Sequence, residues 1–143
     1  ESYTQLLAAI DHWGEGRSLE VFAPTLAGDA LRRRVWGMYE RAAASPAMAR
    51  AVVDAWLELD LSEILPSIQV PTLVTPRTGD FIPVEGGRYA ATTIPGATFI
   101  ELEGVDHIPW FGDSDALVVE IEEWPSASLT TFGCTPRSSS RVA

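Results

Sequence analysis

Two short apolar segments, each followed by a polar residue, constrain the fold of this chain most strongly. The first covers residues 72–75, stops at Pro76, and leads through a Thr-Gly-Asp turn to Asp80. The second covers residues 97–102 and leads into a loop that carries His107. Parallel strands of an open α/β sheet present the residues that follow them at one sheet edge. We therefore expect Asp80 and His107 to lie close together at that edge.

The stretch between the two predicted strands has room for one helix. Pro83 suits the first position of a helix over about 84–93, and Pro95 and Gly96 then turn the chain toward the second strand. A strand, a helix and a second strand in this order predict two parallel strands joined by a crossover helix. The fold class is therefore α/β.

The first sixty residues contain signals for three helices and none for a strand. The helices are predicted over residues 2–12, from the cap residue Asp29 onward, and over about 46–59, where Ser45 and Pro46 mark the start. Apolar residues recur on each helix at three-and-four spacing, so we expect these stripes to be buried. The stripes comprise Leu6, Leu7 and Ile10 on the first helix, Leu31, Val35, Trp36 and Tyr39 on the second, and Met48, Val52, Ala55, Trp56 and Leu59 on the third.

These patterns divide the chain into three parts. Residues 1–66 form a helical cap or lid segment, and residues 67–125 form the part of an α/β core that holds the two strands, with a last helix from about 115 to 124. Residues 126–143 contain no acid and few large apolar residues, so we expect a disordered tail. The first residue is Glu rather than Met, which indicates a processed or truncated piece of a longer protein.

Charge and cysteine content exclude several classes of function. A formal net charge of −10 over 143 residues makes nucleic acid and anionic membranes poor partners. No apolar run is long enough to span a bilayer, and the N-terminus lacks the features of a secretory signal, so we expect a cytoplasmic protein. The single cysteine, Cys134, excludes an internal disulfide, and no Cys/His cluster has zinc-ligand spacing. We expect no metal and no cofactor.

Asp80 and His107 are candidates for the orienting acid and the general base of a hydrolytic triad. A carboxylate that accepts a hydrogen bond from the imidazole Nδ1–H fixes the tautomer and stabilises the imidazolium, while Nε2 faces a nucleophile. Asp106 is the rival carboxylate, although a sequence neighbour usually points away from the ring. The chain contains no G-x-S-x-G nucleophile elbow. Ser18 is its nearest imitation, but no strand precedes it.

Several segments together resemble the C-terminal third of an α/β-hydrolase, across residues 12 to about 124. They are VPTLV, RTGDFIPVE, GRYAATTIPGA, IELEGVDHIPW and GDSDALVVEIEEW, and the earlier WGEGRSLEVFAP and ERAAASPAMARA resemble the cap segment. The closest likeness is to the subgroup fused to class III nucleotide cyclases or to transcription-regulator domains. The resemblance implies that Asp80 is the triad acid after the penultimate strand and His107 the base after the last strand. It also implies esterase-type chemistry, with a nucleophile elbow that would precede residue 1 and a chain that is inactive alone.

Other interpretations stay open at this point. An epoxide hydrolase or dehalogenase relative, which has an Asp nucleophile, would use the same Asp/His geometry. A non-enzymatic binding or regulatory module, or a degenerate truncated product, would explain the missing nucleophile. For an enzyme, the expected substrate is a small ester-like molecule. Two strands cut from a larger sheet leave an unpaired edge, which either self-association or a missing N-terminal portion would cover.

Overall fold

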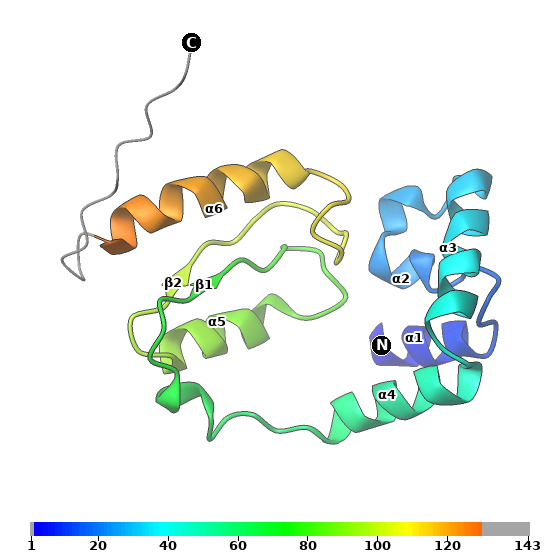
Figure 1. The fold of residues 1–143 in the computed structure, drawn as a ribbon, viewed down its shortest axis with the longest axis horizontal. Helices are drawn as coiled ribbons and strands as arrows, with labels where there is room; N and C mark the ends of the chain where they lie inside the picture. The colour runs from blue at the N-terminus through cyan, green and yellow to red at the C-terminus, as the bar shows by residue number, and fades with distance from the viewer. Residues whose placement is uncertain (1, 130–143) are drawn as a thin grey trace, which may run out of the picture.

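The computed structural model describes the backbone of residues 2–129 and the side chains of residues 3–124. The expected tail beyond residue 129 lies outside the described part. Two halves follow one another along the chain: a helical half, and an α/β half that contains a small sheet (Figure 1). The α/β fold class that the sequence predicted is confirmed.

The helical half is built from short helices joined by tight loops. Its elements are α1 (Ser2–Ile10), α2 (Leu19–Phe22), the 3-10 turn η1 (Pro24–Leu26), α3 (Ala30–Ala43) and α4 (Pro46–Glu58). The start of α3 is fixed by Asp29, whose side chain accepts hydrogen bonds from two backbone N–H groups of the first turn. Ser45 caps α4 in the same way, with Pro46 at its first position. Both predicted caps are therefore confirmed.

The α/β half contains two parallel strands with a helix on either side. Its elements are η2 (Leu65–Ser67), β1 (Leu73–Val74), α5 (Val84–Thr93), β2 (Thr98–Phe99) and α6 (Ser114–Leu129). Leu73 lies opposite Thr98 in the parallel register, and a further bridge joins Arg77 to Leu102. Figure 1 shows α5 and α6 on opposite sides of the strands. The predicted strand–helix–strand unit is confirmed.

Helix α6 extends beyond its predicted end. It continues past Pro125 to Leu129, into the segment that we expected to be disordered. A proline removes one backbone donor and strains the preceding turn, but it does not oblige a helix to end. None of the described helices is both long and apolar enough to cross a membrane.

The main core lies between α1, α2 and α4 and reaches the α/β half through one aromatic ring. Its buried members are Leu6, Ile10, Val21, Ala49 and Val53. Phe81, which follows Asp80 in the turn after β1, packs against this cluster. The apolar stripe predicted for α1 is thus confirmed, because Leu6 and Ile10 are both buried. Phe81 anchors the turn of the candidate acid to the helical half.

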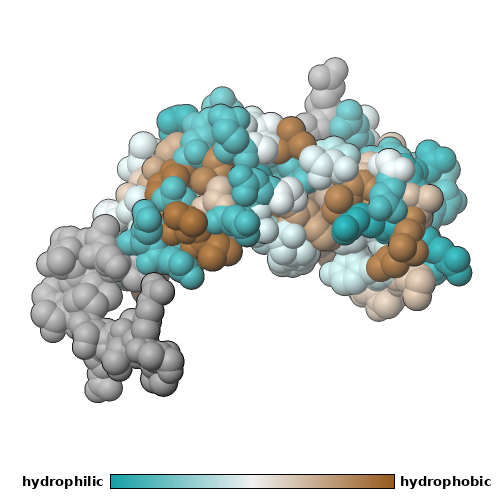
Figure 2. Space-filling model, turned by 90° about the horizontal axis from the view of Figure 1, so that it is seen from above, coloured by the Kyte–Doolittle hydropathy of each residue, from teal (hydrophilic) through white to brown (hydrophobic). Residues whose placement is uncertain are grey.

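The apolar stripes predicted for α3 and α4 are exposed, so that expectation is wrong. Leu31 on α3 is 70% exposed and Trp56 on α4 is 54% exposed. Other exposed stripe members are Val35, Tyr39, Met48, Val52 and Leu59. The buried residues of the two helices are instead Gly37 and Glu40 on α3 and Ala49 and Val53 on α4. Figure 2 shows separate brown hydrophobic patches on the face seen from above.

The buried face of α3 packs closely on the loop between α1 and α2. A Cβ at Gly37 would lie 2.6 Å from the carbonyl oxygen of Gly14, so only glycine fits at this contact. Gly14 and Gly16 adopt positive φ angles of 97° and 80°, which bring their N–H groups toward α3. The Trp13 indole nitrogen donates to the carbonyl oxygens of Glu40 and Ala44. Backbone proximity rather than an apolar stripe therefore holds α3 in place.

Candidate functional site

Asp80 stands at the end of a turn that leaves β1 at its carboxyl end. The Asp80 N–H donates to the Arg77 carbonyl oxygen at 3.3 Å, which closes the predicted Thr-Gly-Asp turn. One carboxylate oxygen, Oδ1, accepts a hydrogen bond from the Ile82 N–H at 3.2 Å. The other oxygen, Oδ2, remains available for a second partner. The side chain of Asp80 is only 11% exposed.

His107 supplies that second partner from the loop after β2. The distance from His107 Nδ1 to Asp80 Oδ2 is 2.8 Å, a hydrogen-bond distance. The His107 side chain is 36% exposed, so the ring lies at the surface of the described part while its carboxylate partner is mostly covered. The parallel pairing of β1 and β2 brings together two residues that are distant in sequence. The predicted proximity of Asp80 and His107 is therefore present.

Aromatic rings hold the imidazole from two sides. The Phe81 ring meets it edge-to-face at a centroid distance of 4.9 Å, and the Phe22 ring lies tilted at 5.9 Å. The backbone N–H groups of His107 and Ile108 both donate to the carbonyl oxygen of Phe22, at 2.9 and 3.3 Å. Ring packing and main-chain bonds thus restrict the orientation of the imidazole.

This arrangement can move a proton at the outer ring nitrogen. With Asp80 accepting from Nδ1–H, Nε2 carries the basic lone pair, and the carboxylate stabilises the imidazolium that forms when Nε2 takes a proton. Among the described residues, Nε2 of His107 has no hydrogen-bond partner. A carboxylate and an imidazole in this geometry suit general acid–base chemistry.

A groove runs along β1 to the candidate pair. It has a volume of about 500 Å³, and Asp80 and His107 both line it. The residues of β1 and the segment directly after it that line the groove are Leu73, Val74, Thr75 and Pro76. The carbonyl oxygens of Thr72, Val74 and Pro76 accept bonds from the β2 segment, so by alternation the backbone groups of Leu73 and Thr75 face away from β2. The groove beside β1 therefore follows a strand edge that has no pairing partner within residues 2–129.

Asp106, the rival carboxylate, has a different set of partners. It is buried, and it accepts hydrogen bonds from the Thr25 N–H at 3.0 Å and from the Thr25 hydroxyl at 2.5 Å. Its carboxylate makes no hydrogen bond to His107 within the described part of the chain. Asp106 therefore fastens the His107 loop to η1. The sequence offered no signal for this tether, because it joins residues far apart in the chain.

Ser18, the nearest imitation of a nucleophile, is buried and occupied elsewhere. Its hydroxyl donates to Glu40 Oε1 at 2.6 Å and accepts a hydrogen bond from the Trp36 indole nitrogen at 2.8 Å. The exposed fraction of Ser18 is 1%. Both hydrogen-bonding roles of the hydroxyl are thus filled by helix α3 rather than by His107.

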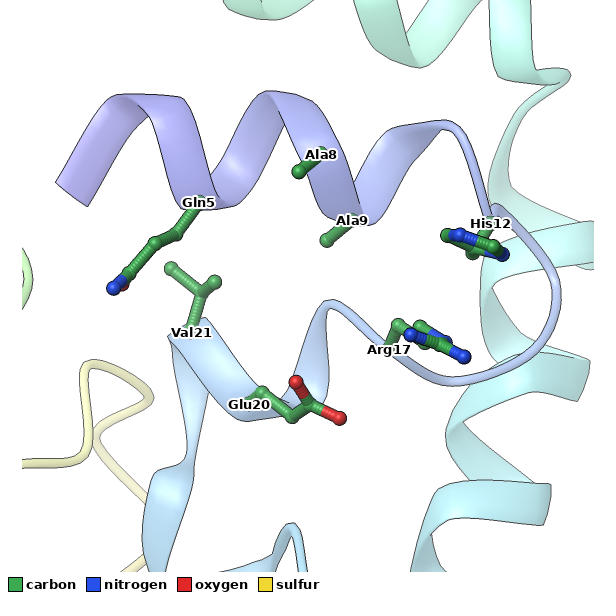
Figure 3. Close-up of a pocket in the computed structure, with 7 residues that line it drawn as sticks. All are labelled: Gln5, Ala8, Ala9, His12, Arg17, Glu20 and Val21. Atoms are coloured by element: carbon green, nitrogen blue, oxygen red, sulfur yellow. The ribbon is translucent and has the colours of Figure 1, made fainter. Parts of the chain in front are cut away.

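A second hollow, of about 400 Å³, lies between α1 and α2 (Figure 3). Figure 3 shows His12 and Arg17 at one end, Gln5 at the other and Glu20 across from α1. His12 Nδ1 lies 3.4 Å from the Glu15 carboxylate at the surface. Among the described side chains, no three His, Cys, Asp or Glu residues gather closely enough to hold a metal ion.

Comparisons with solved structures identify the fold of the chain. No protein-family model and no curated protein sequence matches the chain. Solved structures do match, among them the esterase RhEst1 from Rhodococcus sp. ECU1013 (TM-score 0.60, 21% identity) and olei00960, a hydrolase from Oleispira antarctica (TM-score 0.63, 17% identity). Each match covers 85% of this chain, and 42% and 46% of the respective structures. The chain therefore has part of an α/β-hydrolase fold and spans less than half the length of these proteins.

Proposed function

We propose that this chain carries the acid–base part of an esterase-type active site that acts on a small ester-like substrate. Asp80 is the orienting acid and His107 is the general base. The observation that supports this proposal is the 2.8 Å contact between Asp80 Oδ2 and His107 Nδ1 at the carboxyl ends of two parallel strands. That is the edge at which open α/β sheets present their functional groups. The fold shared with an esterase and a hydrolase supports the same reading.

The nucleophile in this proposal comes from sequence outside the chain. The groove beside β1 follows an unpaired strand edge and ends at the candidate pair. A segment paired in parallel with β1 would satisfy the free backbone groups of Leu73 and Thr75 and would bring its own C-terminal residue close to His107. Such a segment belongs either to an N-terminal portion or to a second chain.

Each half of the proposed reaction needs two proton movements at His107. Nε2 takes the proton of the nucleophilic hydroxyl as that oxygen attacks the ester carbonyl, and Asp80 stabilises the resulting imidazolium. The same proton then passes from Nε2 to the departing alcohol oxygen as the ester C–O bond breaks. Water repeats the cycle on the acyl intermediate: it gives a proton to Nε2, and the nucleophile recovers that proton as the acid leaves. No other co-reactant is required.

Fluorophosphonate labelling, read by intact mass, tests this proposal. We expect no adduct and no esterase turnover from the 143-residue chain, because Ser18 is buried and engaged by Glu40. A longer form that includes upstream-coded sequence should label at one serine, and His107→Ala should abolish both labelling and turnover. Unchanged turnover in the longer His107→Ala form would overturn the triad assignment. A stoichiometric adduct on the 143-residue chain would overturn the proposal that the nucleophile comes from outside this chain.

We also propose that the nearest relatives belong to the subgroup fused to cyclase or regulator domains, on the strength of the quoted motifs. The coding DNA on either side of this chain tests that relationship. A strand and a G-x-S-x-G segment upstream, with a cyclase or regulator domain downstream, would support it. Stop codons at both ends would contradict it and favour a degenerate product.

A further inference from the structure

Arg77 is a buried cation at the end of β1 that the proposed reaction does not use. Its exposed fraction is 5%, and within the described part of the chain it forms no ion pair. Burying a guanidinium without a carboxylate is costly unless its N–H groups are satisfied. The surroundings of Arg77 must therefore supply hydrogen-bond acceptors of another kind.

Those acceptors are four backbone carbonyl oxygens of one loop. Nη1 donates to the carbonyl oxygens of Asp106 and Phe111, both at 2.8 Å. Nη2 lies 3.4 Å from the carbonyl oxygens of Pro109 and Asp113. All four belong to the segment 106–113, which carries His107 and contains no regular helix or strand. A single side chain thus binds four carbonyl oxygens of this loop, whose own backbone bond runs from the Phe111 N–H to the Ile108 carbonyl oxygen at 3.0 Å.

Two glycines make room for this side chain. Gly104 and Gly112 have φ angles of 140° and 67°, which L side chains rarely adopt. A Cβ at Gly104 would lie 3.2 Å from Arg77 Cδ, and one at Gly112 would lie 3.2 Å from Arg77 Nη1. The loop therefore closes around Arg77 at both ends of the segment that presents the imidazole.

We propose that Arg77 is a positioning residue, which sets the orientation of His107 toward Asp80 through the four carbonyl groups. This inference rests on the proposed function and deepens it. The role requires a planar fork of donors, because two of the four acceptors bind Nη1 and the other two bind Nη2. Lysine offers three donors from one atom and cannot span them. Arg77→Lys keeps the positive charge and removes the fork of donors. The variant therefore tests whether the orientation of His107 depends on the charge of residue 77 or on the geometry of its donors.

The tautomer of His107 measures its orientation without any turnover. In a long-range proton–nitrogen correlation spectrum, recorded where both imidazoles are neutral, we expect the wild-type chain to show the Nδ1–H form at His107. Asp80→Asn should abolish that preference, and Arg77→Lys should abolish it as well. Arg88→Lys is the matched control, because Arg88 forms a surface ion pair with Glu101 at 2.8 Å. His12 is the second histidine of the chain and serves as an internal reference.

Folded Arg77→Lys that retains the wild-type tautomer would overturn the inference, and so would a wild-type chain without the Nδ1–H form. If Arg77→Lys does not fold, the inference is tested by warming the wild-type chain. The Arg77 Nη–H protons should then be resolved and slowly exchanging, and on warming they should be lost together with the Nδ1–H preference. Averaged Arg77 Nη–H signals would overturn the inference. So would an Nδ1–H preference at His107 that persists on warming after the Nη–H signals are lost. If Arg77→Lys loses the tautomer but the longer form never labels with fluorophosphonate, only the proposed function is contradicted.

Discussion

The carboxylate of Glu40 lies in the interior of the helical half, surrounded by hydrogen-bond donors. Gly14 and Gly16 donate their N–H groups to Oε2 at 2.7 and 2.9 Å. Ser18 donates its hydroxyl and its N–H to Oε1 at 2.6 and 3.3 Å. Backbone N–H groups on a loop have no other partner available when an acceptor is removed. Glu40 therefore determines the conformation of the loop between α1 and α2.

At this scale we predict that Glu40→Gln lowers the free energy of unfolding by about 3 kcal/mol, because an amide group would turn two donors toward the donors of the loop. Urea unfolding followed by tryptophan fluorescence measures the change. Glu58→Gln, at the exposed end of α4, is the matched control and should leave the midpoint unchanged. Equal midpoints for the two variants would show that the loop does not depend on the Glu40 carboxylate.

At the scale of single elements, two helical glycines have opposite environments. A Cβ at Gly37 on α3 would lie 2.6 Å from a backbone oxygen, whereas a Cβ at Gly86 on α5 would meet nothing within 4 Å. We expect Gly37→Ala to lower the free energy of unfolding by about 2 kcal/mol through overpacking. Gly86→Ala should raise it by about 1 kcal/mol through helix propensity. Thermal unfolding of both variants checks the pair, and a stabilised Gly37→Ala variant would contradict the close contact of α3 with its loop.

Local signals predicted several element positions in this chain. Helix α5 occupies the predicted residues 84–93, and the caps Asp29 and Ser45 accept the expected backbone N–H groups. The pair Asp80 and His107 could also be predicted, because strand ends in a parallel sheet converge on one edge. These features depend on short-range chemistry and on a simple topological rule.

Burial of α3 and α4 could not be predicted from helix periodicity. A stripe of apolar residues indicates which face of a helix is suited to burial, but it does not show that the surface that buries it belongs to the same chain. On α4, Val53 is buried while its neighbour Val52 is 40% exposed. The supports of the site were missed for a related reason. The bonds from Arg77 and Asp106 join loops through space, and no spacing in the sequence encodes them.

For the whole molecule, we propose that further protein surface completes this fold, because the α3 and α4 stripes are exposed and one edge of β1 has no partner among the described residues. The exposed residues of α4 can be tested against their buried neighbours. Val52→Asp should change the free energy of unfolding by less than about 1 kcal/mol and should reduce both self-association and the binding of an apolar dye. Val53→Asp should unfold the chain, because it buries an unpaired charge.

Sedimentation velocity over a range of concentrations, together with dye fluorescence, measures these effects. A wild-type chain that stays monomeric and binds no dye would contradict the assignment of the α3 and α4 stripes as uncovered surfaces. A Val52→Asp variant that unfolds like Val53→Asp would contradict the orientation of α4.

The main-chain bonds from His107 and Ile108 to Phe22, together with the tether from Asp106 to Thr25, have a kinetic consequence. Segment 22–25 cannot move away from the sheet while the imidazole keeps its place, so an opening of this segment displaces His107 at the same moment. Local unfolding of a few residues in the helical half would then act as an off state for proton transfer. The fraction of time that the segment stays closed would set an upper limit on the rate of any reaction at His107.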